Sequence, residues 1–248
     1  MNKLLILSIV IFMCISSSLK ADSLQEEFQT CLFDSIRQRP IPIAIYQPKK
    51  INKHTRVVIF NHGYGKNDSS SYLIYSYLTR ALADNGYYVI SIQHELPNDP
   101  LLAMEGEFMQ TRMPNWKRGV ENIHFIINEF QKLQPILDWK SLALIGHSNG
   151  GDMTMLFAAE YPQLIGKAIS LDHRRMIMPR IGKPRIYTLR GCDYEADNGV
   201  IPTVEEQQKW HTTVIKLDGI KHSDMDNKGT QDQHKAILTN LLKFLNEQ

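Results

Sequence analysis

Short runs of consecutive apolar residues alternate along this chain with longer segments in which apolar residues repeat every three or four positions. The short runs are typical of strands buried on both faces, whereas the longer period is typical of amphipathic helices. The pattern predicts strands at 57–60, 87–92, 141–145, 167–171, 185–189 and 212–217. It predicts helices at 69–86, 115–133, 149–161 and 231–246.

The segment before these strands has a different pattern. Residues 30–37 and 41–46 are predicted to form two short strands around Arg39, and Pro40 and Pro42 favour an edge hairpin, because proline lacks the N–H that pairs with a neighbouring strand. With this antiparallel hairpin, the order of elements predicts a mostly parallel, eight-stranded α/β sheet with helices on both faces. Such sheets bind ligands beyond the carboxyl ends of their strands.

The first 21 residues have the order of a secretory signal peptide. Lys3 precedes an apolar stretch from Leu4 to Ile15, and small residues follow up to Ala21. The stretch is shorter than the roughly 20 residues that a membrane-spanning helix needs. We therefore expect residues 1–21 to be removed, which leaves a single domain over 22–248, exported to the periplasm or secreted, with no stable membrane insertion. The alternative is a buried N-terminal helix.

The balance of charged residues indicates which classes of partner this protein can bind. The chain has 28 Lys and Arg residues and 26 Asp and Glu residues. Because Lys3 and Lys20 belong to the expected signal peptide, the mature chain has no net charge. A nucleic-acid surface requires a basic excess on one face. We therefore expect a small-molecule substrate and no nucleic-acid partner.

One motif carries chemistry. The run Gly146-His147-Ser148-Asn149-Gly150 joins the predicted strand at 141–145 to the predicted helix at 149–161. This is G-x-S-x-G in a strand–turn–helix setting, where a tight turn exposes the serine hydroxyl above the sheet. Glycines flank the serine because side chains at those positions collide with neighbouring backbone. The motif predicts that Ser148 is a nucleophile.

On this motif the chain resembles the α/β-hydrolase superfamily, over about residues 28–247. The resemblance implies two backbone N–H donors that hold the oxyanion formed at a substrate carbonyl. One is the N–H of Asn149, directly after the serine. The other lies in the loop Asn61-His62-Gly63-Tyr64-Gly65, which follows the strand at 57–60, and Tyr64 is the expected donor there.

The superfamily places its residues in the order serine, acid, histidine, which leaves three late histidines. His211 lies at the amino end of the last strand and His234 lies inside the last helix, whereas His222 lies in the loop after 212–217. We expect His222 to be the general base. A metal site at His222 is the alternative, but the neighbouring aspartates are too close in sequence for a strong ligand set, so no metal is expected.

Four carboxyl groups are candidates for the acid. Asp193 is the first carboxylate after the strand at 185–189 and is the expected partner of His222. Glu195 and Asp197 lie in the same loop. Asp172 ends the preceding strand, a position from which some superfamily members take their acid.

The resemblance implies an exported serine hydrolase that cleaves a carboxylic ester through an acyl-enzyme, with no cofactor. Only residues 173–184 separate the strands between which lid-bearing members insert a cap, so we expect an open site, as in the dienelactone-hydrolase and platelet-activating-factor-acetylhydrolase branches. Peptidases, thioesterases and acyltransferases use the same triad. A non-catalytic binding protein on this scaffold is the remaining alternative.

Two segments have open interpretations. Residues 95–114 are rich in leucine and methionine and also contain Phe108. They form either a mobile apolar flap over the acyl group of the substrate or the ordinary apolar packing beneath a long loop. Residues 173–190 contain six basic residues and no acid, and either bind a substrate carboxylate or phosphate or form a solvated basic face. Cys31 and Cys192 fall on opposite sides of the implied sheet, so we expect two free thiols.

Overall fold

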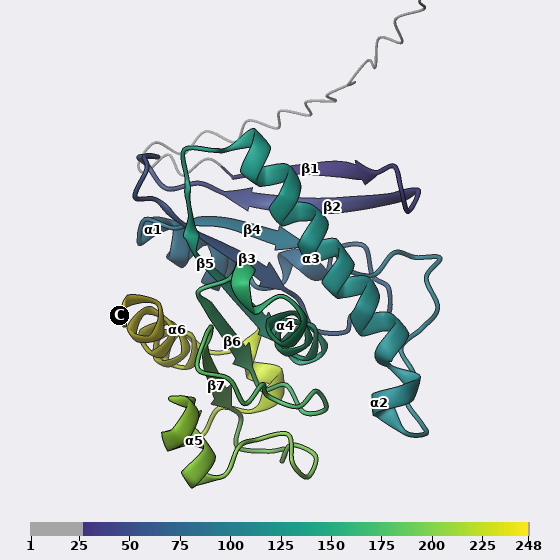
Figure 1. The fold of residues 1–248 in the computed structure, drawn as a ribbon, viewed down its shortest axis with the longest axis vertical. Coiled ribbons are helices and arrows are strands. Elements are labelled where there is room, and N and C mark those ends of the chain that lie inside the picture. The colour runs from purple at the N-terminus through teal and green to yellow at the C-terminus, as the bar shows by residue number, and fades with distance from the viewer. Residues whose placement is uncertain (1–26, 248) are drawn as a thin grey trace, which may run out of the picture.

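The computed structural model describes residues 27–247, and the predicted signal peptide at 1–21 lies outside them. The described residues form one eight-stranded sheet with the order β1-β2-β4-β3-β5-β6-β7-β8 (Figure 1). The strands are β1 (Glu27–Asp34), β2 (Arg39–Tyr46), β3 (Arg56–Asn61), β4 (Tyr88–Ile92), β5 (Asp138–His147), β6 (Lys167–Leu171), β7 (Arg185–Arg190) and β8 (Thr213–Lys216). The helices are α1 (Ser76–Asp84), α2 (Phe108–Thr111), α3 (Met113–Leu133), α4 (Asn149–Glu160), α5 (Val204–Trp210) and α6 (Gln231–Asn246).

The direction of the strands confirms the predicted mixed sheet. β1 pairs antiparallel with β2, and β2 pairs antiparallel with β4. Every other neighbouring pair is parallel. The carboxyl ends of β3, β5, β6 and β7 therefore meet at one edge of the sheet, and loops from that edge can form a common site.

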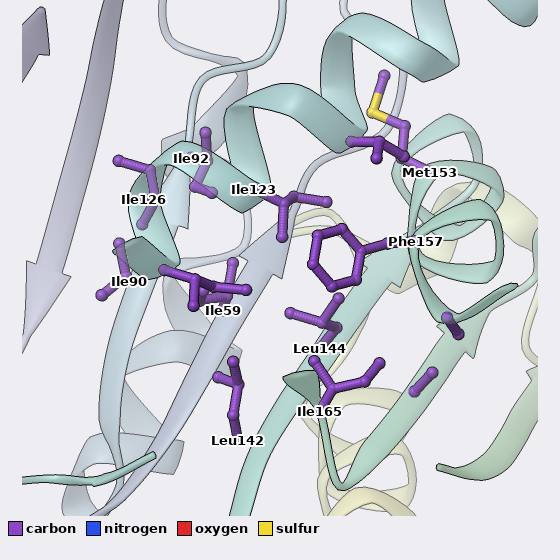
Figure 2. Packing of buried hydrophobic residues seen from close by; sticks show 14 of the residues in the cluster. Ile59, Ile90, Ile92, Ile123, Ile126, Leu142, Leu144, Met153, Phe157 and Ile165 are labelled. Atoms are coloured by element: carbon purple, nitrogen blue, oxygen red, sulfur yellow. The ribbon is translucent and has the colours of Figure 1, made fainter. Parts of the chain in front are cut away.

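The core has two layers because alternate residues of each strand point to opposite faces of the sheet. On one face, Ile59 and Leu144 pack against Ile123 of α3 and Phe157 of α4 (Figure 2). On the other face, side chains such as Phe60 pack against α1 and α6. Since both faces are covered, the inner strands are apolar throughout, and this explains the uninterrupted apolar runs in the sequence.

The predicted helix at 69–86 is wrong as a single element. The segment forms a short 3₁₀ turn at Ser71–Leu73 and then α1. The backbone of Tyr72 explains the break, because its carbonyl accepts a hydrogen bond from Ser91 at 2.7 Å and its N–H donates to Gln93 at 3.2 Å. Bonds to the β4 side of the sheet thus replace the bonds that would continue the helix.

The helix α5 was not predicted from the apolar pattern, since it is short and exposed. Its start nevertheless has a local signal. Thr203 caps the helix by accepting from the N–H of Glu206, while the Glu206 side chain accepts from the Thr203 N–H. This reciprocal pair is a capping box, which is visible in a sequence as Thr-x-x-Glu.

Residues 172–184, between β6 and β7, contain no helix, which confirms the expected absence of a cap. Cys31 on β1 and Cys192 after β7 are free and exposed, as expected from their distance across the sheet. Within residues 27–247, no helix is both long enough and apolar enough to cross a membrane.

Candidate active site

Ser148 lies in a tight turn between β5 and α4. Its backbone has φ 52° and ψ −119°, a conformation that L-residues rarely adopt. A Cβ at Gly146 would lie 2.2 Å from the carbonyl oxygen of Gly150, and a Cβ at Gly150 would lie 2.2 Å from that of Asn61. Both glycines are therefore required by backbone contacts, as the sequence predicted, and together they hold Ser148 in its strained conformation.

His222 lies beside Ser148. It begins a short 3₁₀ turn, His222–Met225, in the loop that follows β8. Its Nε2 is 3.0 Å from the hydroxyl oxygen of Ser148. The serine hydroxyl donates to this nitrogen, because the other ring nitrogen carries the hydrogen that a carboxylate accepts. The structure therefore joins the predicted nucleophile to the predicted base.

The carboxylate that contacts the imidazole ring is Asp172, and the prediction of Asp193 is wrong in this respect. Asp172 Oδ2 accepts from His222 Nδ1 at 2.6 Å. Asp193 Oδ1 instead accepts from the backbone N–H of His222 at 2.8 Å. The other two candidates have different partners: Asp197 pairs with Arg175, and Glu195 pairs with Lys216 at 3.1 Å.

The reason for this difference lies in the ends of two adjacent strands. The N–H of Asp172 donates to the carbonyl of Leu189 at 2.8 Å, which extends the pairing of β6 with β7 by one residue. Asp172 also has φ 54°, so the chain turns sharply there. The fully buried carboxyl group is directed to the loop of His222, whereas Asp193, three residues beyond the end of β7, is exposed and reaches only the main chain.

Asp172 is held in its ionised form. Burial alone would raise the pKa of this carboxyl, but the hydrogen bond from His222 and the charge of Arg190 outweigh burial and lower its pKa. Arg190 Nη2 lies 3.0 Å from Asp172 Oδ1, and the N–H of Gly191 donates to the same oxygen at 2.9 Å. An ionised Asp172 can stabilise positive charge on His222.

The loop after β3 lies against Ser148. A Cβ at Gly63 would be 3.3 Å from the Cβ of Ser148, so the loop that contains Tyr64 approaches the serine at the preceding residue. Asn149 is the first residue of α4, and the first N–H groups of a helix have no acceptor within the helix. The positions of Tyr64 and Asn149 are thus compatible with the predicted pair of N–H donors.

Glu95 is a residue of this site that the sequence analysis did not single out as polar. It is fully buried after β4, and its Oε1 accepts from the side-chain amide of Asn149 at 3.1 Å. Its Oε2 accepts from the N–H of Gly65 at 3.4 Å. Burial raises the pKa of Glu95. The only sequence signal was its place at the carboxyl end of a buried strand, where an acid is unusual.

The side chain of Asn149 is fixed at both ends. Its Oδ1 accepts from the indole N–H of Trp116 at 2.8 Å, and its Nδ2 donates to Asn115 Oδ1 at 2.9 Å as well as to Glu95. Trp116 and Asn115 belong to α3. A buried polar network therefore connects α3, the segment after β4 and the first residue of α4, and it leaves little freedom at the Asn149 backbone.

The buried side chain of His147 supports the His222 loop. His147 Nε2 donates to the carbonyl of His222 at 3.1 Å, and its Nδ1 accepts from the hydroxyl of Tyr75 at 2.8 Å. The same hydroxyl accepts from the N–H of Gly63 at 3.1 Å. Burial lowers the pKa of His147 to about 3, so the ring is neutral and can both donate and accept. These bonds couple the His222 loop to the Gly63 loop across the Ser148 turn.

Among residues 27–247, no cluster of three or more His, Cys, Asp or Glu side chains has the arrangement of a metal site. In the loop of His222, the two aspartates accept hydrogen bonds from nearby backbone N–H groups. Asp224 accepts from the N–H of Lys221 at 2.8 Å, and Asp226 accepts from that of Lys228 at 2.8 Å.

Several solved structures have the same fold. A lidless α/β serine hydrolase from Xanthomonas campestris matches with a TM-score of 0.60 at 15% identity, covering 90% of this chain and 97% of its own. A dienelactone hydrolase-like promiscuous phosphotriesterase from metagenomic libraries has a TM-score of 0.66 at 14% identity, with 88% and 97% covered. The esterase Est22 with p-nitrophenol has a TM-score of 0.66 at 12% identity, with 90% and 81% covered. At these identities the likeness shows the fold.

Two comparisons rest on sequence. A serine hydrolase-like protein from Danio rerio is 33% identical over 48 residues, which span 19% of this chain and 15% of that protein. The model of the BD-FAE family matches residues 43–173, more than half of the chain and the part that contains Tyr64, Glu95, Ser148 and Asp172. The chain is a member of the BD-FAE family, with the α/β-hydrolase fold.

Proposed function

We propose that this protein is a serine hydrolase that cleaves carboxylic esters, with Ser148 as nucleophile, His222 as base and Asp172 as the orienting acid. The observation that carries the proposal is the continuous chain of hydrogen bonds from Asp172 through His222 to Ser148, at 2.6 Å and 3.0 Å, ending on a strained serine. This is the arrangement that activates a hydroxyl for attack.

In the first half of the proposed reaction, Ser148 Oγ bonds to the ester carbonyl carbon while His222 Nε2 takes the hydroxyl proton. The carbonyl oxygen becomes an oxyanion and accepts hydrogen bonds from the N–H groups of Asn149 and Tyr64. When the carbonyl re-forms, the bond to the alcohol oxygen breaks, and that oxygen takes the proton from His222. The acyl group remains on Ser148.

In the second half, water attacks the acyl carbon and gives its proton to His222. The bond to Ser148 Oγ then breaks, the serine recovers the proton, and a carboxylic acid leaves. Throughout, Asp172 holds the Nδ1 hydrogen of His222 and stabilises the charge that the ring gains. All these steps use side-chain and backbone groups of this chain, so the proposal includes no cofactor.

The fold and the motif also accommodate a peptidase, a thioesterase or an acyltransferase. We favour ester cleavage because the solved structures with this fold include the esterase Est22 and a thermostable esterase. We further propose that residues 1–21 direct export, and that the substrate is a small acyl compound. Mass spectrometry of the N-terminus of the protein recovered from culture fractions tests the export proposal.

The test of the activity is labelling of the purified protein with a fluorophosphonate probe, followed by hydrolysis of 4-nitrophenyl esters of increasing acyl length. We expect labelling and turnover in the wild type and neither in Ser148→Ala. Matched thioester and anilide substrates distinguish thioesterase and peptidase activity. A folded wild-type protein that is not labelled near neutral pH would contradict the proposed nucleophile.

A further inference from the structure

In the basic segment 173–190, Arg174 and Arg185 have no carboxylate partner among the described residues, and Arg185 lies at the amino end of β7, away from the site. Three arginines of the segment have carboxylate partners: Arg175 pairs with Asp197, Arg180 with Glu206 and Arg190 with Asp172. Arg174, two residues after Asp172, has no carboxylate within 4.0 Å among the described residues, and its side chain is only partly buried. Its guanidinium therefore keeps its donors available.

An aromatic ring connects Arg174 to His222. The guanidinium carbon of Arg174 lies 4.5 Å from the centre of the Tyr194 ring. The Tyr194 ring in turn meets the His222 ring edge-on, with centres 6.0 Å apart and planes at 89°. Tyr194 is 52% exposed, so this stack is at the surface of the molecule, next to the proposed base. Stacking on a ring fixes a guanidinium plane while leaving its N–H edge free.

Two further arginines lie near Arg174. Arg112 and Arg175 lie against the Phe108 ring, at 4.2 Å and 4.5 Å. Burial is the largest cause that lowers the pKa of Arg112; the charges of Arg175 and Arg174 lower it further, whereas those of Asp152 and Asp197 raise it.

The acids near Arg174 have other partners. In the loop that carries Tyr194, Asp193 binds the His222 backbone, Glu195 pairs with Lys216, and Asp197 binds Arg175. Asp152 is buried and accepts from the backbone N–H groups of Arg175 and Met176. Every acid around the cluster is thus already engaged, and none binds Arg174.

We propose that Arg174, stacked on Tyr194, is a subsite for an anionic group of the substrate, a carboxylate or phosphate carried on the ester that Ser148 attacks. This inference rests on the proposed function. A guanidinium binds either anion through two parallel N–H donors. The subsite selects esters in which several bonds separate the anion from the reacting carbonyl.

The test compares esters that differ only in charge. In the acyl arm, mono-4-nitrophenyl adipate is compared with 4-nitrophenyl hexanoate. In the alcohol arm, 4-acetoxyphenylacetate is compared with 4-acetoxyphenylacetamide. We expect kcat/KM to be about 10- to 100-fold higher for the anionic ester in at least one arm, the range expected for a hydrogen bond to a charged group. Competition by glutarate or by inorganic phosphate shows which anion the subsite prefers.

Variants assign the preference to Arg174. In Arg174→Gln the ratio of the two kcat/KM values should approach 1, whereas Lys209→Gln, which removes an exposed charge on α5, should keep the wild-type ratio. Arg174→Lys, with the charge but no planar donor pair, should have an intermediate ratio. If Arg174→Gln does not fold, the wild-type ratio must still fall when sodium chloride is raised from about 0.05 to 0.5 M, because salt screens an exposed ion pair.

Each result has a distinct meaning. Hydrolysis of neutral esters with no anionic preference in either arm overturns this inference and leaves the proposed function standing. A preference that persists in Arg174→Gln or at high salt overturns the assignment to Arg174. Absence of both fluorophosphonate labelling and hydrolysis overturns the proposed function and this inference with it.

Discussion

Two carboxylates contact His222, but at different atoms. Asp172 binds the ring nitrogen Nδ1, and Asp193 binds the main-chain N–H. The first contact fixes which ring nitrogen carries the hydrogen, whereas the second fixes only the path of the loop. A substitution at each position therefore separates the two roles, even though both aspartates lie within hydrogen-bond distance of one residue.

Asp172→Asn should lower kcat for a 4-nitrophenyl ester by about 10³- to 10⁴-fold, because an amide can turn its N–H₂ group toward Nδ1 and favour the wrong tautomer of His222. Asp193→Asn should lower kcat less than about tenfold, since the asparagine oxygen can still accept from a backbone N–H. Steady-state kinetics of the two purified variants provides the comparison. Equal losses in both would refute the assignment of the acid.

Glu95 is a positioning residue in this scheme, since it binds the Asn149 side chain and the N–H of Gly65. In Glu95→Gln, the new side-chain N–H₂ group faces one of these two N–H donors and repels it. The backbone N–H groups that would bind the oxyanion should therefore shift. We expect kcat to fall by about tenfold or more with little change in KM, because the lost interaction acts in the transition state. Glu105→Gln, an exposed acid of the same segment, is the matched control. A rise in KM alone would contradict this role.

At the scale of elements, the site depends on where strands end and helices begin. β5 passes into α4 through a single strained residue, and β6 is followed directly by a residue with positive φ, Asp172. The two turns lie side by side, because the N–H of Ser148 donates to the carbonyl of Leu171 at 2.9 Å. The positions of Ser148 and Asp172 are therefore set by the pairing of β5 with β6.

Gly150→Ala should destabilise the protein by about 1–3 kcal/mol or more, because its Cβ meets the backbone carbonyl of Asn61, which cannot move without shifting β3. Urea denaturation measures the loss. Gly182→Ala is the matched control, since a Cβ there meets nothing within 4 Å and the residue has no positive φ. Equal stability of the two variants would show that the turn can relax.

At the scale of the whole molecule, buried polar groups connect the segments around the proposed active site to the helices of the core. Asp152, in the first turn of α4, accepts from the N–H groups of Arg175 and Met176 at 3.0 Å and 2.8 Å. These bonds attach the segment after β6 to the helix that follows Ser148. The geometry of Asp172 and Arg174 thus depends on a carboxyl group that lies in neither the proposed triad nor the proposed subsite.

The contribution of Asp152 to the free energy of unfolding depends on pH. Burial raises the pKa of Asp152 from 3.8 to about 6. The folded state therefore binds this proton more tightly than the unfolded state, so the contribution of Asp152 to stability is largest below pH 4 and is lost as the pH rises to about 6.

Asp152→Asn keeps an oxygen acceptor and has no titration. Relative to wild type, its free energy of unfolding should therefore increase by up to about 3 kcal/mol between pH 4 and pH 7. Urea denaturation at both pH values measures this difference, and Asp84→Asn, an exposed acid at the end of α1, is the control. A difference between variant and wild type that stays constant over this range would contradict the raised pKa.

The sequence by itself determined the parts of this protein that depend on neighbours along the chain. The apolar runs predicted six of the eight strands, because strands covered on both faces need no polar residues, and the prolines near Arg39 predicted the hairpin of the other two. The glycines around Ser148 identified the nucleophile turn, since that turn is a local steric problem. His222 followed from its place after the last strand and from the order of residues in the superfamily.

Only the tertiary structure decided which groups meet across strands. Asp172 reaches His222 because β6 pairs with β7 up to Leu189 and the chain turns at Asp172, and the order of carboxylates along the chain does not record this. Glu95 and Arg174 contact partners far away in sequence, on α4 and in the Tyr194 loop. A side chain acts at the distance of a hydrogen bond, and only the packed molecule sets that distance.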